Sequence, residues 1–381
     1  MAQSWEKLLF SMGGALNLQK SFWTLISWKW GKGIAKMSTP AQEPADLLLT
    51  EGYNSKPIIV PRLSPYEGYR TLRVYISPSG STLVALKKLQ DISLAYATAI
   101  TGSSLNRTAF LWSYILYFLP KVKYPALALT LSESDCHTIL SPALMAFLPK
   151  LHINRNTSRA IIHGPESLGG MHLPTVYTEQ CAGQLDYFTG HLNLRDKTGK
   201  LLLISLTYLQ LICGSVTPIL SLPYDKYCKW VEPTWLQSFW GLISKVGYDI
   251  HVHQQWLPIL PRKNDHALMD HFMKLGYSAS QLATLNRCRI YLQIIFLLDI
   301  VSADGRMIIP DCKTGRRVPD RISNLNWPMQ DTPSQSAWQL WKQALAHFEY
   351  GNRLVVPLQQ WQSDTHLQWR WFISPTTKDL F

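Results

Sequence analysis

The chain has 381 residues, of which 46% are hydrophobic and 16% are charged, and its net charge at pH 7 is +12. This composition excludes a disordered tail and allows two or three packed units. The positive charge favours a polyanionic partner, but it is spread along the chain rather than gathered in one tail, so any nucleic-acid surface must be assembled by the fold.

Cysteine usage and hydropathy indicate the compartment. The six cysteines stand far apart and include no Cys-x-x-Cys pair, which argues against a zinc ribbon or a secreted disulfide framework and fits a reducing compartment. The first residues contain no apolar signal segment. The longest uncharged stretch, residues 201–224, is interrupted by Pro218 and Pro223. We therefore expect an intracellular protein, nuclear or cytoplasmic, with no membrane partner.

The most informative segment is residues 12–20, MGGALNLQK. Gly13 and Gly14 permit a tight turn that a Cβ would resist, and Asn17 and Lys20 place a polar group and a positive charge three positions apart. This segment resembles the palm motif G-x-x-L-N-x-x-K of retroelement reverse transcriptases of the non-LTR retrotransposon type. In that family the motif follows the catalytic aspartate pair.

The resemblance implies roles for these residues. The family's lysine lies near the phosphates of the incoming nucleotide, so Lys20 and Asn17 are the expected nucleotide-binding residues; the alternative for Lys20 is a solvated lysine at a turn. The aspartate pair would precede Met1, and the chain contains no Asp-Asp dipeptide. We therefore expect no catalytic residues, no metal ligands and no cofactor in this chain, because Mg²⁺ would require the missing upstream palm.

Residues 31–62 are rich in Gly, Pro, Ser and Ala, which predicts a loop or an inserted hairpin. Residues 69–76, YRTLRVYI, alternate as in a strand and stop at a turn signal. They resemble the Y-R-T-L-G-V strand of the family's primer-gripping region, which implies that Arg70 contacts nucleic acid. Arg73 replaces the family's glycine. It either clashes with the nucleic-acid backbone or adds a phosphate contact, and both alternatives stay open.

From Thr82 to about Leu119 the apolar spacing is helical, with Lys87 and Lys88 outside the stripe. The stripe consists of Leu83, Leu86, Leu89, Ile92 and Tyr96. Ser103 and Asn106 are predicted caps of a helix over 109–119 that Pro120 ends. A third helix is predicted to begin after Thr130, where the segment Leu131-Ser132-Glu133-Ser134-Asp135 supplies a cap and N-terminal acids.

The run of helices from Thr82 after the primer-grip strand resembles the thumb of the family, with a close match over residues 105–125. The resemblance implies contacts with nucleic acid from Lys87, Lys88, Arg107, Lys121 and Lys123. Tyr124 adds an aromatic face beside the last two lysines, a combination typical of single-strand binders. The alternative is a loop that leaves a helix at Pro120.

Residues 151–191 resemble a block that follows the thumb in these polymerases, and the resemblance adds Arg155 and Arg159 as contacts. Gly164-Pro165 and Gly169-Gly170 are predicted to bracket a tight loop. Further helices are expected over 177–192, 201–213, 234–246, 265–275, 281–298 and 336–347. A hairpin over 300–309 is expected to turn at Asp304-Gly305.

The C-terminal half contains three further polar groups. The first is a basic cluster, which is our leading phosphate-contact site outside the thumb, with a solvated loop as the alternative; it comprises Arg306, Lys313, Arg316, Arg317 and Arg321. The second consists of four histidines, for which a histidine-bearing surface is favoured over a zinc site; these are His251, His253, His266 and His271.

The third group is made of arginines. The pattern of Arg262, Asp265, Met269 and Asp270 resembles the family's tail and implies an internal ion pair. Arg287 and Arg289 either meet phosphate at a helix start or form a buried salt bridge to Asp299 or Asp304.

The expected fold is α+β and predominantly α-helical. It comprises a palm remnant with a primer-grip-like strand (1–78), a helical thumb-like region (79–198) and a helical extension with a hairpin near 300–309 (199–381). The resemblance implies the C-terminal part of an RNA-directed DNA polymerase, inactive alone, whose partners are an RNA–DNA or DNA duplex, bound weakly and without specificity, and the rest of a polymerase. The alternatives are an inert retrotransposon relic and a domesticated protein-interaction scaffold.

Overall fold

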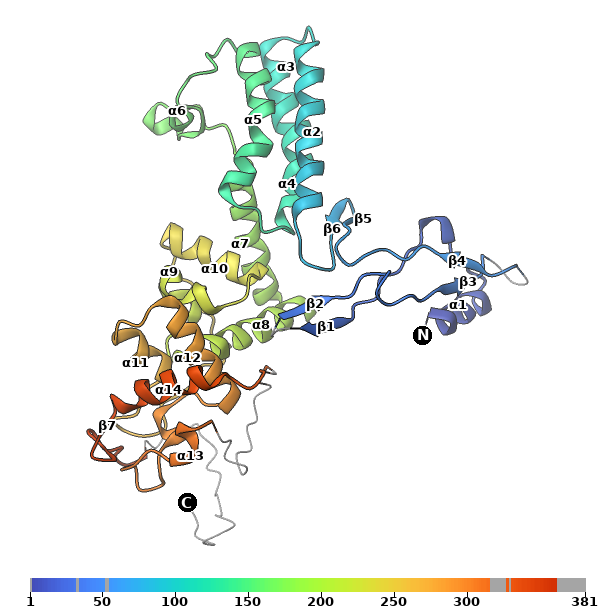
Figure 1. Ribbon diagram of the computed structural model, residues 1–381. Helices are drawn as coiled ribbons and strands as arrows, with labels where there is room; N and C mark the ends of the chain where they lie inside the picture. The colour runs from blue at the N-terminus through green and yellow to red at the C-terminus, as the bar shows by residue number, and fades with distance from the viewer. Residues whose placement is uncertain (1, 32–33, 52–54, 316–326, 329, 362–381) are drawn as a thin grey trace. The chain divides into compact units, whose positions relative to one another are not determined.

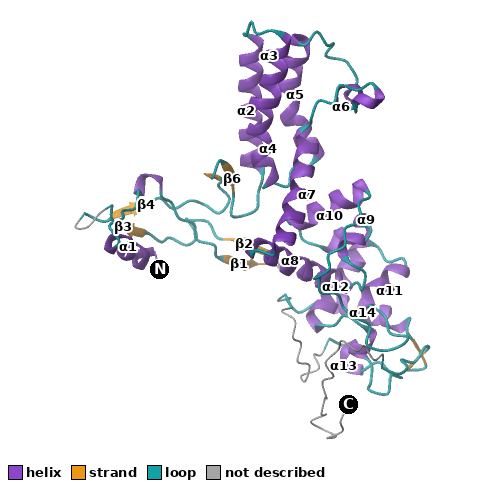
Figure 2. Ribbon diagram, turned by 180° about the vertical axis from the view of Figure 1, so that it is seen from behind, coloured by secondary structure: helices purple, strands orange, loops and turns teal. Residues whose placement is uncertain are grey.

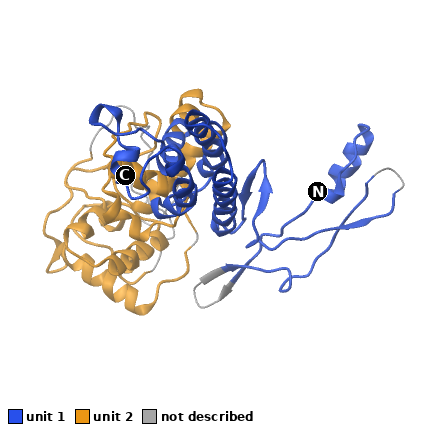
Figure 3. Ribbon diagram, turned by 90° about the horizontal axis from the view of Figure 1, so that it is seen from above, with its two compact units in different colours: residues 1–187 blue, residues 188–381 orange. Residues whose placement is uncertain are grey.

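The structure is a computed structural model that describes residues 2–31, 34–51, 55–315, 327–328 and 330–361. Helices account for 53% of it, and the strands of the described residues form only two-stranded antiparallel sheets (Figure 2). The expected predominantly α-helical α+β class is therefore confirmed. The chain divides into two compact units, residues 1–187 and 188–381 (Figure 3). The expected finer division at 78/79 and 198/199 stays a prediction.

Unit 1 begins with short elements around a small apolar core of Leu18, Leu49 and Val60. Between residues 28 and 60 the chain forms two hairpins where a loop or hairpin is expected. The elements are α1 (Ala2–Ser11), the 3-10 turn η1 (Leu18–Lys20), β1 (Trp28–Gly31), β2 (Ile34–Met37), β3 (Leu47–Leu49) and β4 (Ile58–Val60).

The predicted single strand over 69–76 is wrong, because the segment folds back on itself as β5 (Tyr69–Thr71) and β6 (Val74–Ile76). Arg70 lies opposite Tyr75 in this hairpin. Leu72 and Arg73 form the turn with φ of 50° and 69°. Positive φ at both central residues is the geometry that matches the twist of a two-residue hairpin. Since both arms alternate with the same period, the alternation did not reveal the turn.

The helical part of unit 1 packs around one core (Figure 1). Buried Leu89 and Tyr96 confirm part of the predicted stripe, whereas Leu83 is exposed. Asn106 caps α3, and Ser132 and Asp135 form a reciprocal capping box on α5, as predicted. The elements are α2 (Leu83–Thr101), α3 (Arg107–Trp112), η2 (Ser113–Phe118), α4 (Leu119–Leu127) and α5 (Glu133–Lys150).

The prediction that Pro120 ends a helix is wrong, because the helix runs on through α4 to Leu127. A proline lacks the amide donor and clashes with the carbonyl one α-helical turn back. Here the preceding turn, η2, is π-helical, and the Leu119 amide donates to the Tyr114 carbonyl, five residues back. The wider turn removes the conflict at Pro120, so the helix can continue.

The loop after α5 contains α6 (Arg159–His163) and η3 (Glu166–Leu168) and leads into α7 (Val176–Leu194). The predicted tight loop is present. The His172 amide donates to the Gly164 carbonyl at 2.9 Å. A Cβ on Gly170 would lie 2.2 Å from that same carbonyl oxygen, so only glycine fits there.

Unit 2 is helical around a core that includes Phe272, Leu285 and Trp341. The expected hairpin over 300–309 is present as a short antiparallel pairing. Val301 bridges Ile308, and the amides of Ser302 and Ile309 donate to the carbonyls of Met307 and Ile300. The elements are α8 (Lys197–Cys213), η4 (Ile219–Ser221), α9 (Tyr224–Tyr227), η5 (Cys228–Trp230), α10 (Trp235–Val246), α11 (Leu268–Lys274), α12 (Ala279–Leu292), η6 (Leu297–Ile300), α13 (Pro310–Lys313), α14 (Gln335–Ala346), β7 (Glu349–Tyr350) and β8 (Arg353–Leu354). None of the described helices combines the length and apolarity needed to cross a bilayer.

Replacing Arg73 by glycine is expected to raise the free energy of unfolding by about 1 kcal/mol, because a Cβ is unfavourable at positive φ. Urea unfolding of the full chain measures the change. Arg73→Ala is the matched control, since it removes the guanidinium but keeps the Cβ. Equal stability of the two variants would contradict the turn geometry.

Candidate nucleic-acid interface

Four of the predicted contact residues lie on the β5–β6 hairpin and the first turns of α2. Arg70 lies opposite Tyr75, so their side chains share one face of the hairpin. The Lys88 ammonium lies 6.0 Å from the centre of the Tyr75 ring, at the outer limit of a cation–π contact. We call Arg70, Arg73, Tyr75, Lys87 and Lys88 the hairpin–α2 cluster. All four cations are exposed.

The hairpin is held against α2 by apolar packing. Val74 is buried in the same core as Ala85 and Leu89 of α2. Gly68 allows the close approach, because a Cβ there would lie 2.9 Å from the Val84 Cβ. The Ser77 hydroxyl donates to the Pro65 carbonyl at 2.9 Å and ties the hairpin's two ends together. The cations of the cluster are therefore presented on a supported surface rather than on a free loop.

One carboxylate, Asp91, accompanies the cluster. Its distance to the Lys88 ammonium is 3.8 Å, with both side chains about half exposed. An exposed pair of this kind contributes little to stability, so Lys88 can exchange Asp91 for a phosphate at small cost. Arg73 lies at the exposed tip of the hairpin. Its backbone has φ 69°, a conformation that favours glycine.

The predicted contact residues on α3 and α4 have different surroundings. The Lys121 ammonium lies 3.5 Å from the centre of the Tyr117 ring. Lys123 forms an ion pair with Glu179 of α7, so its charge is already neutralised. Arg107 is exposed at the start of α3.

Arg155 is exposed in the loop after α5, and the Arg159 guanidinium lies 3.9 Å from the Met145 sulfur. These two residues are on a different segment from the hairpin–α2 cluster. Arg316 and Arg317, together with Arg321, lie outside the described residues. Of the same basic cluster, Lys313 is bound to the Glu349 carboxylate at 2.7 Å and is largely buried, so it is an internal ion pair.

Asn17 and Lys20 are joined by a hydrogen bond between the Asn17 side chain and the Lys20 backbone. The Asn17 side-chain oxygen accepts from the Lys20 amide at 3.2 Å and caps η1. Both residues are exposed, and Leu18 between them is buried. The observed role of Asn17 is that of a helix cap. Within the part of the chain that the structure describes, no group of three or more His, Cys, Asp or Glu side chains is arranged to hold a metal.

The predicted internal ion pair between Arg262 and the nearby aspartates is wrong. The buried Arg262 guanidinium donates to three backbone carbonyls, those of Gln359, Ala303 and Leu358. Asp270 instead accepts from the Tyr227 hydroxyl at 2.9 Å and the Ser215 hydroxyl at 3.0 Å. A guanidinium has five donors, and carbonyl oxygens can satisfy them as carboxylates do.

Both alternatives for Arg289 are also wrong. It lies in the last turn of α12, fully buried, and donates to the carbonyls of Leu211 (2.7 Å) and Ile212 (2.9 Å) at the end of α8. These carbonyls have no partner within their own helix, and a cation at a helix C-terminus is favourable. Burial lowers the pKa of Arg289 to about 10. Arg289 therefore joins two helices and is inaccessible to phosphate.

The histidines divide into two groups. His266 and His271 stack with ring centres 5.8 Å apart, and His271 packs against Phe348. Burial lowers the pKa of both imidazoles. His251 lies 3.2 Å from the exposed Asp249 carboxylate. His251 and Asp249 are surface groups. In the stacked pair His266 is also exposed, and half-buried His271 makes the contact with Phe348.

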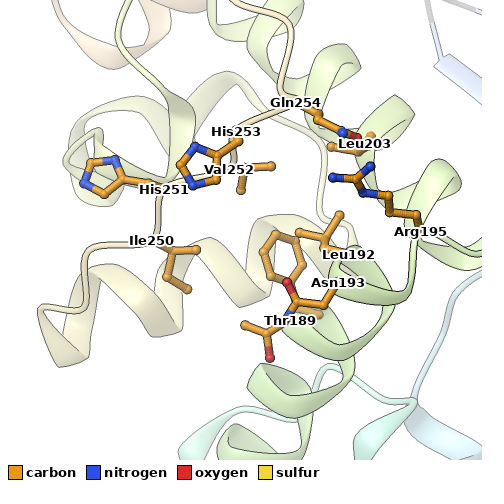
Figure 4. A pocket seen from close by; sticks show the side chains of 11 residues that line it. Thr189, Leu192, Asn193, Arg195, Leu203, Ile250, His251, Val252, His253 and Gln254 are labelled. Carbon is orange, nitrogen blue, oxygen red and sulfur yellow. The ribbon is translucent and has the colours of Figure 1, made fainter.

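Sequence reasoning missed two features. One is Tyr75, the aromatic ring between two cations, which only the hairpin register reveals. The other is a groove of about 240 Å³ in unit 2, whose lining includes Arg195, His251 and His253 (Figure 4). Its described lining contains no Asp or Glu. Comparison of the chain with protein-family models, curated proteins and solved structures finds no match.

The buried Asp265 predicts a pH dependence of stability. Burial raises its pKa to about 6, so the folded state binds more protons than the unfolded state between about pH 4 and pH 6. The free energy of unfolding therefore falls as pH rises through this range. The Asp265→Asn variant should not show this loss, so its free energy of unfolding at pH 7 should exceed that of the parent chain by about 3 kcal/mol. This difference corresponds to about two pKa units at about 1.4 kcal/mol each.

Urea unfolding of both chains at pH 4 and pH 7 measures this difference. Asparagine keeps the oxygen that accepts from the amides of His266 and Leu298. Asp304→Asn is the control with the opposite sign, because a hydrogen bond from Ser302 lowers the pKa of Asp304. A stability difference for Asp265→Asn that is the same at both pH values would refute the assignment.

Proposed function

We propose that unit 1 binds a nucleic-acid duplex through the hairpin–α2 cluster, with an RNA–DNA hybrid as the first candidate ligand. In this proposal the chain is the primer-template-binding C-terminal part of a retroelement-type reverse transcriptase. It holds duplex and does not by itself transfer nucleotides. The observation that supports the proposal most strongly is the convergence of Arg70, Tyr75 and Lys88, which the β5–β6 hairpin and helix α2 bring together.

Two further points support it. The cluster contains four exposed cations, as a phosphate-binding surface requires, and the neighbouring Asp91 carboxylate is only weakly paired with Lys88. The GGALN-x-x-K segment, the Y-R-T-L segment and the 105–125 segment occur in the order in which the resembling polymerases have them. Contacts of this kind fall on phosphates, so affinity should depend on salt and little on sequence.

Each of the substitutions Arg70→Ala and Lys88→Ala should remove one phosphate contact from the bound duplex. We plot the logarithm of the association constant against the logarithm of the salt concentration, and we expect the slope to fall in magnitude by about 0.9 for each variant. Fluorescence anisotropy with a labelled RNA–DNA hybrid, from 50 to about 200 mM salt, measures this slope. Lys342→Ala, which removes the same charge from an exposed site in unit 2, is the matched control.

The proposal fails if the full chain shows no affinity below micromolar for the hybrid at low salt. It also fails if Lys342→Ala changes the slope as much as the two cluster variants, because the charge would then act only through the net field of the protein.

A second candidate function is protein binding by the first 60 residues. Their buried core is small, whereas many large apolar side chains are exposed, as expected at an interaction surface. These are Trp5, Leu8, Met12, Phe22, Ile26, Trp28, Leu48, Ile58 and Ile59. The partner in this candidate is a protein with a complementary apolar surface, such as the remaining part of a polymerase.

Self-association offers a test of this apolar surface. Sedimentation of the full chain should show association that is insensitive to salt, because apolar contacts drive it. Ile59→Lys, at a position 60% exposed, should weaken it, and Val356→Lys, at an exposed apolar site in unit 2, should not. A monomeric chain at tens of micromolar, or equal effects of both variants, would exclude self-association through this surface.

A further inference from the structure

A row of exposed aromatic side chains follows the continuous helix α3–η2–α4. The rings are Trp112, Tyr117 and Tyr124, which are 53%, 56% and 53% exposed. Leu116, also exposed, lies between the first two. Single exposed rings are common on protein surfaces, so the feature to explain is their succession along one helix.

The π-helical turn creates this row. Phe110, Tyr114, Phe118 and Val122 are all buried at intervals of four residues. In an α-helix, with about 3.6 residues per turn, a four-residue interval drifts around the axis. The wider turn at η2 cancels the drift and keeps those four side chains on the core. The same correction keeps Trp112, Tyr117 and Tyr124 together on the outer face.

The spacing of the rings suits stacked bases. At about 1.5 Å per residue of α-helix, Tyr117 and Tyr124 are about 10 Å apart along the axis. Trp112 and Tyr117, which are separated mostly by the wider π-helical turn, are at most about 7.5 Å apart. Stacked nucleotides repeat at about 3.4 Å along a strand. Consecutive rings are therefore two to three nucleotides apart.

The charge of this region fits a polyanion. Residues 92–132 contain no Asp or Glu, and Glu179 of α7, which meets this helix, is paired with Lys123. The Lys121 ammonium lies 3.5 Å from the Tyr117 ring centre, on the exposed face. Arg107 adds an exposed cation at the start of α3. A protein partner would need acidic groups to meet these cations, whereas a nucleic-acid strand supplies both the phosphates and the rings.

We propose that Trp112, Tyr117 and Tyr124 form a stacking surface for single-stranded nucleic acid, with Lys121 as its phosphate contact. The inference rests on the proposed function, because it assigns single-stranded nucleic acid as a second ligand to unit 1. The hairpin–α2 cluster contacts duplex phosphates, and the aromatic row holds an unpaired strand. Base–aromatic stacking tolerates any sequence, so no sequence preference is expected.

The test uses the full chain and fluorescein-labelled single strands, dT20 and rU20, with the RNA–DNA hybrid as a parallel ligand. Tyr117→Ala and Trp112→Ala should each weaken single-strand binding by about fivefold or more and leave hybrid binding unchanged. Tyr117→Phe should retain single-strand affinity, since it keeps the ring. Tyr350→Ala removes an 86% exposed ring from unit 2 and is the matched control. Circular dichroism verifies that each variant is folded.

The outcomes separate this inference from the proposed function. If the hybrid binds and the alanine variants bind dT20 as tightly as the parent chain, the aromatic row is not the site, and duplex binding stands. If Tyr117→Phe loses affinity as Tyr117→Ala does, the ring does not act by stacking. If neither ligand binds the parent chain, both proposals are wrong.

Discussion

The helical core of unit 1 depends on one local constraint, the burial of Phe110, Tyr114, Phe118 and Val122 at four-residue intervals. A regular α-helix cannot keep such a series on one face, and Pro120 also forbids the normal hydrogen bond at that point. The π-helical turn at Ser113–Phe118 resolves both conflicts at once. The packing that holds the core together therefore also determines which rings remain at the surface.

The hairpin of β5 and β6 shows how packing and function are linked at a second place. Val74 is anchored in the helical core, and this fixes the face on which Arg70 and Tyr75 lie. Arg73 retains a backbone conformation that suits glycine, at φ 69°. The chain thus accepts a strained turn residue at an exposed position where an arginine also adds positive charge. In our account this exchange favours phosphate binding at the cost of some stability.

Sequence patterns predicted the parts of the fold that depend on local chemistry. The caps at Asn106 and Ser132 and the tight loop at Gly164 and Gly170 are examples, because each depends on residues a few positions apart. The hairpin turn at Leu72–Arg73 was missed because these are not the usual residues of a hairpin turn. The helix through Pro120 was missed because a proline usually ends a helix. The partners of Arg262 and Arg289 were missed because backbone carbonyls distant in sequence leave no trace in a residue pattern.

The candidate site was predicted only in part for the same reason. The cations of the hairpin–α2 cluster stand out in the sequence, but Tyr75 joins them only through the strand register and the Lys88 contact. Photo-crosslinking of the full chain to an RNA–DNA hybrid with photoreactive backbone groups, followed by peptide mapping, tests the account most directly. We predict crosslinks within residues 69–88, suppressed at high salt. Crosslinks confined to unit 2, or unaffected by salt, would contradict it.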